Sequence, residues 1–203
     1  MQKYTEQATV KKVQKFYSTL SNAYSLAMKE NGTIDEWGLT GNSSESAEKI
    51  YEMLFKPYFK ISKDCGRNNK GKCITNLQYK LLDNSDTESY GTNGIYYKIA
   101  LEDGATAWFR GDSQRSTSFA VFYDVNGIKE PNQWGKDLFY FSIINDKVYP
   151  SGTDRSYFPF NTYCKKTTTG YGYGCAAWLI YKGNMDYLHC TGLKWTSRSC
   201  KEK

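Results

Sequence analysis

The sequence predicts an α+β fold class, in which a long N-terminal amphipathic helix packs on an antiparallel β-sheet, with a short second helix and a loop-rich C-terminal region. Helical periodicity is confined to about the first sixty residues, and period-two alternation follows Cys73. Helices segregated ahead of strands are typical of α+β proteins. The chain has 203 residues and no internal repeat or linker, so we expect one domain. Its parts are a helix at 1–31, a helical and loop region at 32–72, and the sheet with a disulfide-braced C-terminal region at 73–203.

The first predicted helix covers residues 5–31 and ends at Gly32, a residue suited to the left-handed turn that closes a helix. Its apolar side chains recur every three or four residues, which is the spacing of one helical face. The residues of this face that we expect to make helix contacts, with the chain's own sheet and with a neighbouring molecule, are Val10, Val13, Phe16, Tyr17 and Leu20. A helix of about 26 residues is about 39 Å long, and we expect it to project beyond its own sheet toward a partner.

The remaining elements follow in order. A second helix is predicted over residues 43–56, where Pro57 ends it. Residues 95–101 and 105–110 flank Glu102-Asp103-Gly104 and predict a hairpin. Further strands are expected at 118–123, 138–144 and 176–181, which makes a sheet of four to six strands.

The six cysteines fall into three short-range pairs, Cys65/Cys73, Cys164/Cys175 and Cys190/Cys200. Each pair encloses a flexible loop rich in Gly, Asn, Thr or Ser, and an even number of cysteines without a C-x-x-C motif favours disulfides in an oxidising compartment. The alternative is a structural zinc site with ligands from Cys65, Cys73 and His189 or Cys190, although the usual two-residue ligand spacing is missing.

Composition and motifs favour a protein without catalytic activity. The net charge of +6 is spread along the chain, so a nucleic-acid partner is not expected. The sequence has neither a run of 18 apolar residues nor a secretory leader. It also lacks G-x-S-x-G, H-E-x-x-H and phosphate-loop motifs. The single histidine, His189, follows no cysteine-hydrolase signature, so we predict no enzyme.

Residues 124–141, DVNGIKEPNQWGKDLFYF, form the most distinctive segment. Asn126-Gly127 tolerates positive φ and reverses the chain, and Asp124 can cap backbone N–H groups within the turn. The oxygens of Asp124, Asn126 and Asp137 also suggest a calcium site, although the EF-hand pattern lacks its final glutamate. Turn capping is the interpretation that we favour.

This segment, the first helix ending at Gly32 and the Asp103-Gly104 hairpin resemble type IV pilins and the pseudopilins of type II secretion. The distinctive segment is similar to the pattern vDvNG-x-k-x-PN-x-x-G-x-D-x-F found in that superfamily. The resemblance implies a pilin-like fold and, ahead of these residues, a basic leader, a cleavage site and an apolar anchor that the printed sequence does not contain. It also implies that some members hold calcium in a headgroup loop.

The resemblance further implies a structural subunit of a type IV pilus or pseudopilus that serves adhesion, motility or secretion. Its partners would be copies of itself, other pilin subunits and an inner-membrane assembly machinery. It would reside in a cell-surface pilus or the periplasm, anchored in the membrane before assembly. The alternative is a secreted carbohydrate-binding or adhesive module, in which Trp134 and Trp195, flanked by polar residues, stack on sugars. We expect Trp108 and Trp178 to lie in the core.

Overall fold

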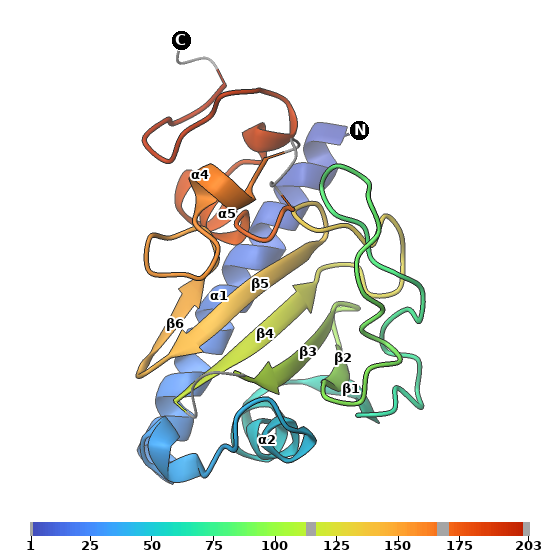
Figure 1. Cartoon of the computed structure of the whole chain (residues 1–203), viewed down its shortest axis with the longest axis vertical. Helices are drawn as coiled ribbons and strands as arrows, with labels where there is room; N and C mark the ends of the chain where they lie inside the picture. Colours follow the sequence, from blue (N-terminus) through green and yellow to red (C-terminus); the bar gives the residue numbers. More distant parts are fainter. Residues whose placement is uncertain (1, 113–116, 166–170, 201–203) are drawn as a thin grey trace.

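A single six-stranded antiparallel sheet forms the centre of the protein (Figure 1). The computed structural model describes residues 2–112, 117–165 and 171–200. The strands pair in chain order and form a meander. They are β1 Ile61–Gly66, β2 Tyr97–Leu101, β3 Thr106–Gly111, β4 Ser118–Asp124, β5 Leu138–Ile144 and β6 Lys147–Pro150.

The longest helix, α1 Gln2–Asn31, crosses behind the sheet in Figure 1. No helix among the described residues combines the length and apolar character needed to cross a bilayer. The other helical elements are short: η1 Ile34–Trp37, α2 Ser44–Ile50, the π-helical η2 Tyr51–Phe55, α3 Lys56–Tyr58, α4 Phe160–Tyr163, α5 Ala176–Lys182 and η3 Asp186–Leu188.

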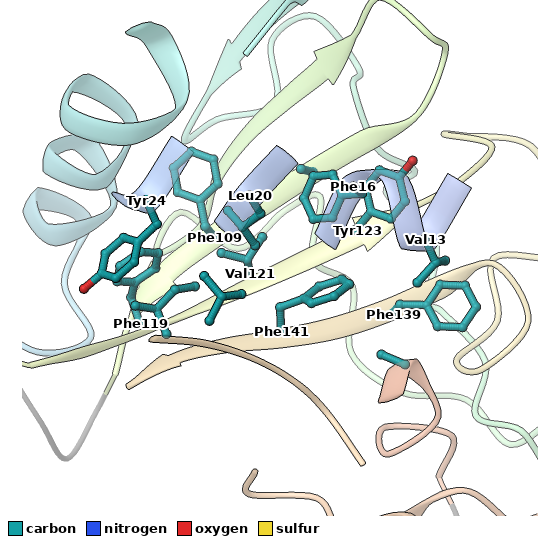
Figure 2. Close-up of a cluster of buried hydrophobic side chains, with 14 of the residues drawn as sticks. Val13, Phe16, Leu20, Tyr24, Phe109, Phe119, Val121, Tyr123, Phe139 and Phe141 are labelled. Atoms are coloured by element: carbon teal, nitrogen blue, oxygen red, sulfur yellow. The ribbon is translucent and has the colours of Figure 1, made fainter. Parts of the chain in front are cut away.

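The face of the sheet that contacts α1 carries the larger hydrophobic core. Because side chains alternate along a strand, Phe109, Tyr123 and Phe141 point to this face from three neighbouring strands. Phe16 of α1 stacks on Tyr123 with ring centroids 3.9 Å apart, and Figure 2 shows both side chains within this cluster. Leu20 lies one helical turn further along, in the same core.

The opposite face of the sheet carries a second, aromatic core. Trp108 of β3 stacks on Phe122 of β4 with parallel rings 5.7 Å apart. This core includes residues of the 73–96 segment and of the C-terminal region, such as Tyr90 and Tyr173. The central strands β3, β4 and β5 are therefore buried on both faces.

The fold class predicted from the sequence, a pilin-like arrangement, is wrong. The long N-terminal helix and the antiparallel sheet are present, but the sheet dominates the core and the other helices are short. Loop segments bury the second face of the sheet, so a second and smaller core lies away from α1. Sequence periodicity does not reveal this second layer, because the loops that form it have no regular pattern.

Three local predictions differ from the structure in instructive ways. The run at 176–181, expected to be a strand, is helix α5, which ends at Gly183 with φ 71°. A six-residue apolar run fits a buried strand and a buried helix equally well. Strands β1 and β6 were not expected. Three of the six residues of β1 are exposed, and β6 has only four residues, so neither shows the alternation of a half-buried strand.

Candidate functional site

The apolar face of α1 is engaged within the molecule itself. Val10, Val13, Phe16 and Leu20 are at most 5% exposed and lie in the core against the sheet, while Tyr17 is half-buried beside Phe141. These residues, expected to contact a neighbouring molecule as well as their own sheet, contact their own sheet. The apolar face of α1 is therefore covered within the chain itself.

That other face of α1 is polar and exposed along its length. Its residues recur at helical spacing and are Lys11, Lys15, Ser18, Asn22, Ser25 and Lys29. At its beginning, α1 is tied to the C-terminal region, because Glu6 forms an ion pair of 2.9 Å with His189. Further along, the amide of Gln14 donates to the carbonyl oxygens of Leu179 and Ile180 in α5. The helix is held on one side and presents the other to its surroundings.

The connection between β4 and β5 places Asp124 and Asp137 together inside the protein. Asp124 is completely buried and accepts hydrogen bonds from the backbone N–H of Asn126 at 3.1 Å and from the Tyr79 hydroxyl at 3.2 Å. Asp137 accepts from the backbone N–H groups of Asn132 at 2.9 Å and Gln133 at 2.6 Å. Both carboxylates therefore cap turns of this connection.

The same connection is where the sequence suggested calcium. In favour of a cation, the side-chain oxygens of Asn126 and Asn132 are buried without a hydrogen-bond partner. Against it, both oxygens of each aspartate already accept hydrogen bonds, whereas calcium needs six to eight oxygen ligands. Among the described residues, no three His, Cys, Asp or Glu side chains are grouped to hold a metal ion. The donor set fits turn capping better than calcium.

Burial dominates the electrostatics of this pair. It raises the pKa of Asp137 to about 6. Burial, and after it the charge of Asp137, raises the pKa of Asp124 well above its ordinary value. Asp137 also lines a neighbouring cavity of about 370 Å³ together with Lys12, Lys136 and the first turns of α1.

All six cysteines form disulfides in the predicted neighbour pairs: Cys65–Cys73, Cys164–Cys175 and Cys190–Cys200. The alternative zinc site is not assembled, because Cys65 and Cys73 are bonded to each other, as Cys190 is to Cys200, and His189 pairs with Glu6 at the start of α1. The Cys164–Cys175 disulfide lies in the larger core.

The structure separates the two tryptophans expected to be exposed. Trp134 is only 1% exposed, so the expectation of an open stacking surface there is wrong. It is buried because the connection folds back under Tyr173, whose ring meets Trp134 edge-on at 4.3 Å. Trp195 is half-buried, with the Lys182 ammonium 5.3 Å from its ring centroid. Trp108 and Trp178 lie in the core, as expected.

Comparison with known proteins adds a family but no activity. A protein-family model described as "Family of unknown function (DUF6613)" matches residues 1–193. The chain belongs to this family. No curated protein and no solved structure matches it. The DUF6613 match includes α1, the whole sheet and the β4–β5 connection, so the candidate features other than Trp195 and Cys200 lie within the family's shared region.

Sequence reasoning missed two charged residues on the face of the sheet opposite α1. Glu88 and Arg110 line a small cavity whose other walls are aromatic, Trp134 among them. Arg110 is at the end of the predicted strand 105–110, whereas Glu88 lies in a segment with no predicted element. Nothing in the sequence around either residue indicates that the two side chains line one cavity. Tyr96 joins them, because its hydroxyl donates to Oε1 of Glu88 at 3.1 Å and its ring lies 5.7 Å from the Arg110 guanidinium.

Proposed function

We propose that this chain is a structural subunit of a surface filament of the type IV pilus or pseudopilus class. The proposal is supported by the resemblance of residues 124–141 to the recurrent segment of those subunits. It does not depend on a pilin-like fold. In this proposal the subunit acts by assembly, in contact with copies of itself and with other subunits.

The observation that carries the proposal is the division of α1 into two faces. Its apolar face is buried by the chain's own sheet, and its polar face is exposed from Lys11 to Lys29. A helix held rigidly at the surface with one long uncovered face is suited to pack beside neighbouring subunits. Since this face is polar, it aligns subunits rather than driving association, because apolar burial is the main driving force of assembly. The driving force would come from an apolar anchor ahead of these residues, as the resemblance implies.

The disulfides support the compartment that the proposal requires. Three disulfides are rare in a reducing cytosol and common in secreted and periplasmic proteins. A filament subunit at the cell surface, or a pseudopilus subunit in the periplasm, would fold there. Crosslinks that close loops stabilise such a subunit against unfolding outside the cell.

The test places bulk on the exposed face of α1. Ser18→Tyr and Asn22→Tyr, in cells that express the protein from its own gene, should lower the amount of filament sheared from the surface by about tenfold or more, as expected when an interface residue clashes. Asp154→Tyr, an equal change at an exposed loop position, is the matched control. Electron microscopy and quantitative immunoblotting of the sheared fraction provide the measurement.

The thermal midpoint of each purified variant shows whether the fold is intact. Filaments that form at the normal level from folded Ser18→Tyr and Asn22→Tyr subunits would show that this face is not an assembly surface. The absence of any filament from the unaltered protein would contradict the proposed function as a whole.

A carbohydrate-binding module is the second candidate. One observation favours it, namely the aromatic cavity beside Arg110.

A further inference from the structure

A small cavity of about 160 Å³ lies on the face of the sheet opposite α1. Nine of the residues that the structure describes line it; seven are aromatic, and the other two are Glu88 and Arg110. Strands β3, β4 and β5 supply its floor through Arg110, Phe122 and Tyr140, which point to the same face. Glu88 is exposed and therefore marks the side on which the cavity meets solvent.

Two donor groups of the residues that line this cavity have no hydrogen-bond partner in the described part of the chain. They are the indole N–H of Trp134 and the Nε–H of Arg110, and both atoms are buried. An unpaired buried donor costs about 1–3 kcal/mol, so both groups would gain from an acceptor oxygen that a shift of either side chain toward the cavity brings within reach.

The aromatic walls also carry hydroxyl groups. Tyr90, Tyr96, Tyr140 and Tyr173 line the cavity, and burial raises the pKa of each of them. Their hydroxyls therefore remain protonated at neutral pH and can both donate and accept hydrogen bonds. Glu88 adds an acceptor and Arg110 adds donors. The cavity can therefore pair with a ligand hydroxyl whether that hydroxyl donates or accepts a hydrogen bond.

The size of the cavity limits the ligand to one ring. Binding sites for drug-sized molecules have volumes of about 300–1,000 Å³, whereas an engineered cavity of about 150 Å³ in another protein holds a benzene ring. A hexopyranose has more heavy atoms than benzene, so its ring would enter the cavity while its outer hydroxyls stay at the open side that Glu88 marks. It presents C–H groups that pack on aromatic faces and a rim of hydroxyls that both donate and accept hydrogen bonds.

The opposite charges of Glu88 and Arg110 argue for a neutral ligand. Both lie beside Tyr96, one through the hydrogen bond to its hydroxyl and the other over its ring. An anionic ligand would meet the Glu88 carboxylate as well as the Arg110 guanidinium.

We propose that this cavity binds a single neutral pyranose unit, the terminal sugar of a glycan. The Arg110 guanidinium donates to a hydroxyl oxygen, Glu88 accepts from a hydroxyl, and the tyrosine rings line the site around its C–H face. This binding is independent of filament assembly, since the cavity lies on the face of the sheet away from α1.

The test uses the purified chain and the methyl glycosides of glucose, galactose and mannose. Saturation-transfer NMR detects binding, and titration of tryptophan fluorescence, to which Trp134 contributes, measures the Kd. Removal of one charged hydrogen-bonding group by Arg110→Met, or of one hydroxyl by Tyr96→Phe, should weaken binding of the preferred glycoside by about tenfold. The matched controls are Arg67→Met and Tyr181→Phe, at exposed positions away from the cavity.

Unchanged binding in the two controls and about tenfold loss in folded Arg110→Met and Tyr96→Phe would support the proposal. Far-UV circular dichroism and the thermal midpoint verify the fold of each variant. The absence of saturation transfer from every glycoside, or equal affinity in all variants, would overturn it. Binding of methyl glucuronide or phenol in place of the neutral glycosides would also overturn it. The binding experiment does not measure the amount of filament. Failure of the sugar-binding proposal therefore leaves the filament proposal standing, and failure of the filament proposal leaves the sugar-binding proposal standing.

Discussion

Tyr79 and Asp124 are joined by a hydrogen bond of 3.2 Å between the tyrosine hydroxyl and Oδ2 of the aspartate, and both side chains are completely buried. The bond connects the irregular segment 73–96, which packs on the face of the sheet opposite α1, with Asp124, the last residue of β4. Asp137 adds a second carboxylate to the same interior region. Burial raises the pKa of both Asp124 and Tyr79, and neighbouring carboxylate charges, that of Asp137 among them, raise both further. This polar cluster makes the stability of the protein depend on pH.

Asp137 should make the protein less stable as the pH rises from 4 to 7. Burial raises its pKa from 3.8 to about 6, so its favourable contribution is complete below pH 4 and is lost as the pH rises through 6. Urea denaturation at several pH values should show a loss of roughly 1–3 kcal/mol over this range. In Asp137→Asn the slope should be smaller, and an unchanged slope would contradict the assignment.

Added calcium distinguishes turn capping from a metal site at the same residues. If Asp124 and Asp137 only cap turns, millimolar calcium should leave the thermal midpoint at pH 7 unchanged. A midpoint that rises with calcium concentration, and does so only in the unaltered protein and not in Asp137→Asn, would instead identify a calcium ligand set.

Lys98 should produce the opposite pH dependence at alkaline pH. The side chain is completely buried, and its ammonium donates to the carbonyl oxygens of Arg67 and Asn93. Burial, and secondarily the charge of Arg67, lowers its pKa from 10.5 to about 8. Between these values the unfolded chain binds more protons, so stability should rise with pH.

The rise should amount to roughly 1–2 kcal/mol between pH 8 and 9.5, below the range in which tyrosines of the unfolded chain ionise. Guanidinium denaturation across this interval is the measurement. The free energy of unfolding of Lys98→Met should not change with pH in this interval. If it rises with pH as it does in the unaltered protein, another group is responsible.

Phe16 should contribute far more to stability than the neighbouring exposed face of the same helix. It is 4% exposed, stacks on Tyr123 and also contacts the rings of Phe59 and Phe141. Phe16→Ala should therefore lower the free energy of unfolding by about 3–5 kcal/mol. Ser18→Ala, two residues away on the exposed face, should change it by less than about 0.5 kcal/mol. Similar losses in the two variants would place the helix differently from this structure.

The Cys164–Cys175 disulfide should be the more costly of two similar crosslinks to remove. It closes a separation of 11 residues and Cys190–Cys200 one of 10, so the loss of chain constraint is about the same, roughly 3 kcal/mol each. Of the four cysteines in these two crosslinks, only Cys164 and Cys175 are buried in the core.

Replacement of each pair by two serines should reveal the difference. Two hydroxyls placed in the apolar core add about 1–3 kcal/mol to the loss for Cys164→Ser with Cys175→Ser. Urea denaturation of both double variants under the same oxidising conditions is the comparison. Equal losses would indicate that the core relaxes to hydrate the serines.

Elements with a local signal were predictable from the sequence. The spacing of apolar residues predicted α1, and the Glu102-Asp103-Gly104 turn predicted the β2–β3 hairpin, because both patterns depend on residues a few positions apart. Strand β1 was not predicted, since its partner β2 begins about thirty residues later and its own exposed residues show no alternation.

The burial of Trp134 illustrates why the candidate site could not be predicted. Its neighbour Gln133 is polar, which suggested exposure, yet Gln133 is 2% exposed because its amide donates to the carbonyl oxygen of Leu81 at 2.7 Å. That contact spans 52 residues. The cavity beside Arg110 depends on the same long-range packing of irregular segments, for which the sequence has no periodic signal.

The contact of Gln14 with α5 has a consequence for how the chain folds during synthesis. A ribosome makes α1 before the sheet, and the carbonyl groups that Gln14 meets in α5 follow 165 and 166 positions later. The meander can grow strand by strand through nearby pairings, whereas the docking of α1 is a contact of very high sequence separation and is correspondingly slow. Until the sheet and α5 have been made, part of the apolar side of this helix therefore remains exposed, and exposed apolar surface favours aggregation of a folding chain.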